Sequence, residues 1–112
     1  MNDLQSQIQQ VEVSLEEAER IAAFGEALNR LENNRDFQTV ILEGYFQKEA
    51  SRLVMLTGEI NLKPEQKEAV YAGIRGIAEL RQFFIARRTA GQMAAKEILD
   101  FKEALDEMRE EA

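Results

Sequence analysis

The C-terminal part of the chain carries an unbroken heptad pattern of apolar positions. From Val70 to Met108 the stations are alternately three and four residues apart, and only Gly73, Arg87 and Gly91 interrupt their apolar character. The stations are Val70, Gly73, Ile77, Leu80, Phe84, Arg87, Gly91, Ala94, Ile98, Phe101, Leu105 and Met108. Such a repeat is typical of a helix that packs along one seam.

The heptad pattern predicts a single long helix over residues 64–111. Pro64 falls where proline is best tolerated, at the first position of a helix, and no proline interrupts residues 65–112. At about 1.5 Å per residue, roughly 45 helical residues would extend nearly 70 Å. A break at residues 88–91, which would fold the tail back as a fourth helix, is the open alternative.

The stretch "DFQTVILEGYFQKEASRL", residues 36 to 53, has apolar residues at helical spacing and predicts a helix over residues 36–57. Asp36 can cap its start, and Gly58 can supply a left-handed residue at its end. Gly44 inside the helix suggests the close approach of another backbone. The face expected to dock on the long helix within the chain consists of Phe37, Val40, Ile41, Gly44, Tyr45 and Leu53.

Ahead of these elements, Ser14 and Glu17 have the spacing of a capping box, which marks a helix start. We therefore predict a helix over residues 15–33 behind a looser N-terminal arm, residues 1–14. The Asn33–Asn34 pair ends that helix, because asparagine prefers caps and turns. Apolar spacings of four, three and four within residues 4–15 leave a helical arm as the alternative.

Together these elements predict an all-α, single-domain chain: a helical hairpin or three-helix unit with one long C-terminal heptad helix. The two shorter helices can cover only part of the long one, so we expect its distal seam to pair with another copy or another protein. Arg87 is expected to form a buried polar layer that fixes register or copy number. The expected oligomer interface is Ile77, Leu80, Phe84, Arg87, Ala94, Ile98, Phe101, Leu105 and Met108.

Composition argues against catalysis. The 112 residues are 45% hydrophobic and 31% charged, which is ordinary for a folded helical protein, and they contain neither cysteine nor histidine. Disulfides, thiolate metal sites and the commonest general base are therefore excluded. We expect no enzyme, no cofactor and no metal.

The beginning of the sequence lacks the pattern of a secretory signal, and no apolar run approaches the roughly 18 residues of a membrane helix. The sequence therefore predicts no membrane partner.

Charge narrows the range of partners further. The chain has 14 basic and 21 acidic residues, a net charge of -7, which disfavours broad binding to nucleic acid. A local nucleic-acid contact would use Arg75, Arg81, Arg87 and Arg88. Residues 94–112 carry three basic and seven acidic residues, which suits solubility or a basic partner.

The sequence "RDFQTVILEGYFQKEASRLVML", residues 35–56, resembles a block in small helical proteins encoded among the virion structural genes of tailed bacteriophages. The matching positions are Asp36, Phe37, Val40, Ile41, Gly44, Tyr45, Phe46, Glu49, Ala50, Arg52 and Leu53. The resemblance implies a virion structural or assembly protein, such as a head, head-to-tail or scaffold component.

On this reading the chain is a homo-oligomer that contacts other virion proteins such as the portal or capsid. It would reside in the virion, or in the host cytoplasm during assembly. The alternative is a helical adaptor or inhibitor that binds a basic site on a host or phage protein.

Overall fold

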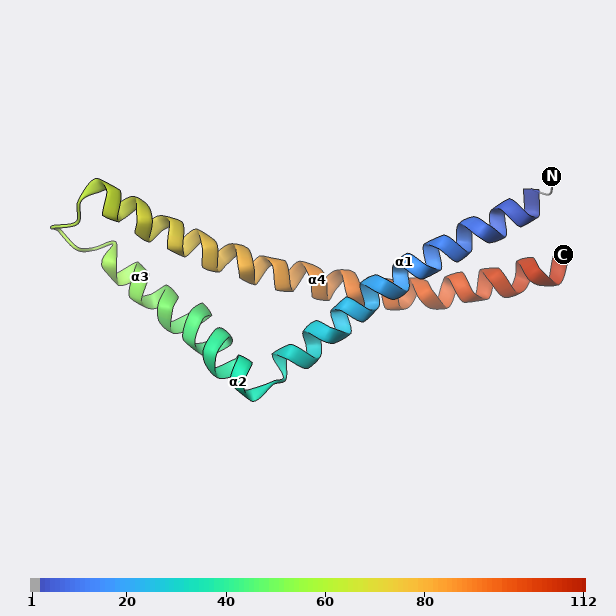
Figure 1. Ribbon diagram of the computed structural model, residues 1–112, viewed down its shortest axis with the longest axis horizontal. Coiled ribbons are helices and arrows are strands. Elements are labelled where there is room, and N and C mark those ends of the chain that lie inside the picture. The colour runs from blue at the N-terminus through green and yellow to red at the C-terminus, as the bar shows by residue number, and fades with distance from the viewer. Residues whose placement is uncertain (1–2) are drawn as a thin grey trace. The chain divides into compact units, whose positions relative to one another are not determined.

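The computed structural model describes residues 3–112, and the regular structure of these residues is all helical (Figure 1). The elements are α1 (Asp3–Glu32), α2 (Arg35–Phe37), the π-helix η1 (Gln38–Glu49), α3 (Ala50–Leu56) and α4 (Pro64–Glu111). The all-α class and the long C-terminal helix are confirmed.

Helix α1 begins well before the predicted residue 15. The stretch expected to be a loose arm is helical from Asp3, and Ser14 lies inside the helix rather than at its start. The physical reason is the apolar spacing of four, three and four, which continues in the same alternation to Ala18 and Ala22. Leu4, Ile8, Val11 and Leu15 are all half-buried.

A two-residue turn separates α1 from the next helix, as the asparagine pair predicted. The cap, however, is Asn34 and not Asp36: Asn34 has extended backbone angles, and its Oδ1 accepts a hydrogen bond from the Phe37 backbone N–H at 2.9 Å. This bond satisfies one of the free N–H groups at the helix start.

From Arg35 to Leu56 the chain is helical throughout, but its middle is not an α-helix. Residues Gln38–Glu49 form the π-helix η1, in which hydrogen bonds join residues five apart and widen the turn. The helix ends through i→i−3 bonds from Thr57 to Val54 and from Gly58 to Met55. Gly58 is not left-handed, since no glycine among the described residues has a positive φ.

Helix α4 runs without a break across residues 88–91, so the fourth-helix alternative is wrong. Pro64 occupies its first position as predicted. The Gln66 side chain accepts a hydrogen bond from the backbone N–H of Lys63 at 2.9 Å, which caps the start.

The chain divides into two compact units. Unit 1 joins the described residues up to Leu28 to Arg87–Ala112, and unit 2 is Asn29–Ala86. In unit 1, α1 and the C-terminal part of α4 run antiparallel (Figure 1). Its core is Ala18, Ala22 and Ala94, with Ile98 and Phe101 against them, whereas the core of unit 2 is Leu53, Val70 and Ile77.

Candidate interaction surface

The distal part of the α4 seam is covered by α1. Ala94 packs against Ala18 and Ala22, with Ile98 and Phe101 beside them. Leu105 is only 3% exposed, and Met108 is half-buried. The expectation that these seam residues await another copy is therefore corrected: because α1 extends back to Asp3, it reaches the end of the seam that a shorter helix would have left open.

The proximal part of the seam is filled within unit 2. Ile77 and Val70 are buried with Leu53, while Leu80 and Phe84 are half-buried. A Cβ added at Gly73 would lie 3.0 Å from Leu53 Cδ1, so this gap in the apolar pattern is the notch that receives the leucine side chain. These predicted stations therefore pack within the chain itself.

The backbones of α1 and α4 approach closely at Gly25 and Gly91. A Cβ built at Gly25 would stand 3.0 Å from Gly91 Cα, and one built at Gly91 would stand 3.0 Å from Gly25 Cα. Gly44, expected at such a crossing, does not lie at one. Among the described residues, its added Cβ would meet only the Thr39 carbonyl oxygen of its own helix, at 3.1 Å.

Arg87, predicted to form a buried polar layer, is not buried within the chain itself. Arg87 is exposed although it stands at a seam station, and its neighbour Arg88 is half-buried. The physical reason is the glycine crossing one turn away. Because Gly25 and Gly91 bring the two backbones together, little room remains between the helices for a guanidinium.

The predicted docking face of residues 36–53 is correct at its two ends and shifted in its middle. Leu53 is buried, and the Phe37 ring lies 5.8 Å from the Phe84 ring, centroid to centroid. Val40 is 63% exposed instead of docked. Phe46, which was not assigned to the face, contacts Phe84 at 5.8 Å.

Val40 leaves this face because η1 has more residues per turn than an α-helix. Of the remaining predicted positions, Ile41 and Tyr45 are half-buried, and Tyr45 packs on the core of unit 2.

Charged side chains connect the two helices of unit 1 along one edge. Arg109 Nη2 donates a hydrogen bond to Glu12 Oε1 at 3.2 Å. Beside this pair lies an open groove of about 560 Å³. Its lining is Glu12, Leu15, Glu16, Glu19, Lys102, Leu105, Asp106 and Arg109. The groove is acidic on the α1 side and mixed on the α4 side.

Ion pairs also form within unit 2. The Arg52 guanidinium donates to both carboxylate oxygens of Glu49, each at 2.7 Å. This hydrogen bonding lowers the pKa of Glu49 and raises that of Arg52. Arg75, one of the four arginines considered for nucleic acid, pairs with Glu68 at 3.7 Å, and Arg81 is exposed.

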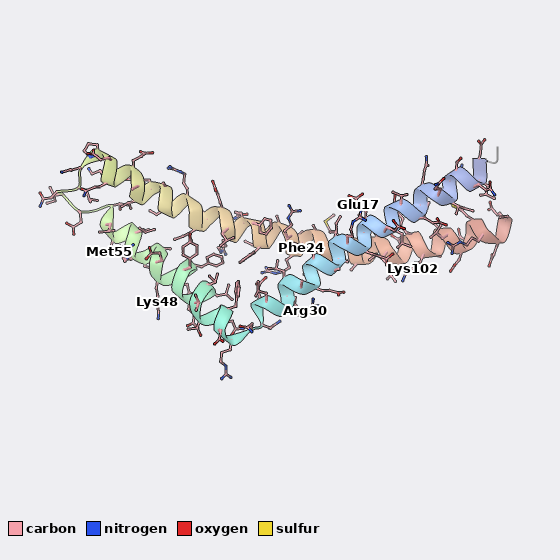
Figure 2. The ribbon with its side chains drawn as sticks, in the orientation of Figure 1. Glu17, Phe24, Arg30, Lys48, Met55 and Lys102 are labelled. Atoms are coloured by element: carbon pink, nitrogen blue, oxygen red, sulfur yellow. The ribbon has the colours of Figure 1, made fainter. Side chains whose placement is uncertain are left out.

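Several large apolar side chains remain on the surface of each unit. In unit 1, Leu99 is 69% exposed and Met93 is 58% exposed. In unit 2, Met55 is 77% exposed (Figure 2). Val54 and Ile60 of unit 2 are also exposed. Exposed apolar side chains in such number on a small chain indicate a partner chain or self-association.

Other kinds of site have less support in the described part of the chain. Residues 3–112 contain no group of three or more carboxylates placed to hold a metal ion. None of their helices is long and apolar enough to cross a membrane. Comparison of the chain with protein-family models, curated proteins and solved structures finds no match.

Proposed function

We propose that this chain is a non-enzymatic structural or assembly protein of a tailed-bacteriophage virion, acting through helix-helix association with copies of itself and with other virion proteins. The observation that carries the proposal is the exposed apolar surface left after the heptad seam has been filled within the chain. Leu99 and Met55 are its most exposed examples on α4 and α3.

Two further features support this assignment. The small size of the chain limits how much apolar surface it can bury alone, so association gives the remaining side chains a place to pack. The block at residues 35–56 resembles a segment of small helical virion proteins, and Phe37, Tyr45, Phe46 and Leu53 of that block build the core of unit 2 or its aromatic contacts. The head, head-to-tail and scaffold roles all fit these features.

The first test is the mass of the protein in solution. Sedimentation velocity at tens of micromolar should give a multiple of the 12.8 kDa chain mass. Leu99→Glu and Met55→Glu should each lower the mass or weaken the association, because a carboxylate would replace an apolar contact. A single 12.8 kDa species at every concentration would argue against self-association.

Matched controls distinguish the effect of losing an apolar contact from the effect of adding a charge. Gln92→Glu on α4 and Gln47→Glu on η1 add the same carboxylate at exposed positions without removing an apolar side chain. Both controls should keep the parental mass. Mass spectrometry of purified virions then tests the second half of the proposal, and absence of the chain from virions and from assembly intermediates would contradict it.

The alternative function, a helical adaptor or inhibitor of a basic site, is favoured by one specific observation. The groove of unit 1 is lined on its α1 side by Glu12, Glu16 and Glu19. Replacing these three glutamates by glutamine would abolish capture of a basic partner and leave self-association through Leu99 and Met55 unchanged. The two functions are therefore distinguishable with one variant.

A further inference from the structure

One phenylalanine of α4 is held between two phenylalanines of the helix opposite. The Phe84 ring centroid is 5.8 Å from that of Phe37 and 5.8 Å from that of Phe46, with interplanar angles of 52° and 57°. Tilted rings at this separation attract one another beyond the burial of their area. All three residues lie in unit 2.

This arrangement depends on the type of helix between Phe37 and Phe46. In an α-helix with 3.6 residues per turn, residues nine apart face nearly opposite directions, so both rings could not reach the same partner. In a π-helix the i→i+5 bonds place roughly four to five residues in a turn, and two such turns return a residue nine positions later to the same face. The contact of both rings with Phe84 therefore requires the π-helix.

Gly44 is the one residue of η1 that lacks a Cβ. A Cβ there would stand 3.1 Å from the carbonyl oxygen of Thr39, which is five residues earlier, the separation of hydrogen-bonded partners in a π-helix. Any side chain at position 44 would crowd that carbonyl. Glycine is also disfavoured in an α-helix, so Gly44 lowers the stability of the α-helical form of this segment.

The sequence nonetheless contains a competing α-helical register. Val40, Ile41 and Gly44 stand three, four and seven residues after Phe37, which is the spacing of one α-helical face. In the π form this face is broken, and Val40 is 63% exposed. The backbone on both sides is ordinary right-handed helix, with φ and ψ of −62° and −41° at Phe37 and −58° and −46° at Ala50. The junctions can thus continue as α-helix without a turn.

We infer that residues 38–49 are a bistable element, π-helical while Phe84 is held between Phe37 and Phe46 and α-helical once that contact is lost. In the α form, Phe46 turns away from Phe84, and Val40 and Gly44 move onto the face of Phe37. Any event that removes Phe84 from between the two rings would therefore change which side chains of residues 38–49 face α4 and which face solvent. The inference concerns the helix alone and does not depend on the virion assignment.

Through-hydrogen-bond N–C′ couplings measured by NMR on the isotope-labelled full chain test this directly. In the parent protein, the amides of residues 44–49 should couple to the carbonyls five residues earlier. In Phe84→Ala, and independently in Gly44→Ala, the couplings should shift to the carbonyls four residues earlier. Two separate variants keep the test decisive if one of them folds poorly.

Two controls carry the same chemical changes elsewhere. Phe101→Ala removes a phenylalanine from α4 in unit 1, and Gly58→Ala adds a Cβ whose nearest neighbour is 3.5 Å away. Both controls should keep the couplings to the carbonyls five residues earlier. The inference is overturned if the parent shows couplings four residues back, or if Phe84→Ala and Gly44→Ala both retain the parental pattern.

Discussion

The glycines of α4 differ in their surroundings. The space around each glycine determines whether an added methyl group stabilises or destabilises the protein. At Gly91 an added Cβ would meet the backbone of α1 at 3.0 Å, whereas at Gly76 it would meet only the Tyr45 hydroxyl at 3.9 Å, an ordinary contact. A backbone atom cannot swing aside as a side chain can. Position 91 is therefore restricted to glycine by packing, and position 76 is not.

Gly91→Ala should consequently destabilise the protein, while Gly76→Ala should stabilise it. Both changes improve helix propensity by about 1 kcal/mol. At position 91, overpacking that costs about 1–3 kcal/mol outweighs this gain, so a net loss of about 1 kcal/mol is expected. Urea unfolding of the two variants measures the difference, and equal shifts in the same direction would contradict the close crossing of Gly25 and Gly91.

The Glu49–Arg52 pair gives a pH dependence at the residue scale. The guanidinium lowers the pKa of Glu49 in the folded chain, so the stabilisation from this pair is present above the pKa of an unfolded glutamate and is lost as pH falls through the lowered value. Both side chains are on the surface, so the effect on folding is small. In an NMR titration of the carboxyl carbon, Arg52→Gln should move the midpoint of Glu49 to higher pH. An unchanged midpoint would mean that the pair does not persist in solution.

At the scale of elements, the heptad pattern is sufficient to predict α4, because its twelve stations follow one another with no proline that would end the helix. Eleven of those stations are buried or half-buried, and only Arg87 is not. What covers the distal seam does not follow from the capping-box spacing at Ser14, because that spacing places the helix start too far along the chain. The apolar positions Leu4, Ile8 and Val11 form one heptad series with Ala18 and Ala22, and this series is the signal for the helix that covers the distal seam.

The π-helix could not be predicted by a periodicity argument that assumes 3.6 residues per turn. The one available signal was a mismatch of phase: Phe37 and Leu53 are sixteen residues apart and would not share a face of an ideal α-helix, yet both are strong candidates for docking. The wider turns of η1 bring both ends onto α4. The same change in phase exposes Val40 and brings Phe46 to Phe84.

Residues 3–14 belong to α1, and we expect them to stabilise unit 1. A chain that begins at residue 15 would lose the cover over the end of the seam, leaving Met108 and one side of Leu105 exposed. We expect this deletion to lower the melting temperature and to increase self-association, since the uncovered seam is a heptad surface. Sedimentation velocity and circular dichroism on the shortened chain measure both effects. A shortened chain with parental stability and mass would show that residues 3–14 contribute nothing to unit 1.

At the scale of the whole molecule, the division into two units with separate cores has a consequence for local stability. Proteins open in cooperative parts whose free energies differ, and amide hydrogen exchange reports each part. Leu105 is 3% exposed and belongs to unit 1, whereas Ile77 is 5% exposed and belongs to unit 2. A cavity at either position removes packing from one core and leaves the other core intact.

Leu105→Ala should accordingly speed exchange in residues 3–28 and 94–111 more than in residues 35–56, and Ile77→Ala should do the reverse. Each substitution should lower the free energy of unfolding by about 2 kcal/mol. This value is at the lower end for truncating a large buried aliphatic side chain, because a core formed by two layers of helix can relax around the cavity. Native-state exchange with the parent protein as reference provides the comparison. If both variants accelerated exchange equally along the entire chain, the two cores would unfold as one cooperative structure, and α4 would transmit the loss of packing from one unit to the other.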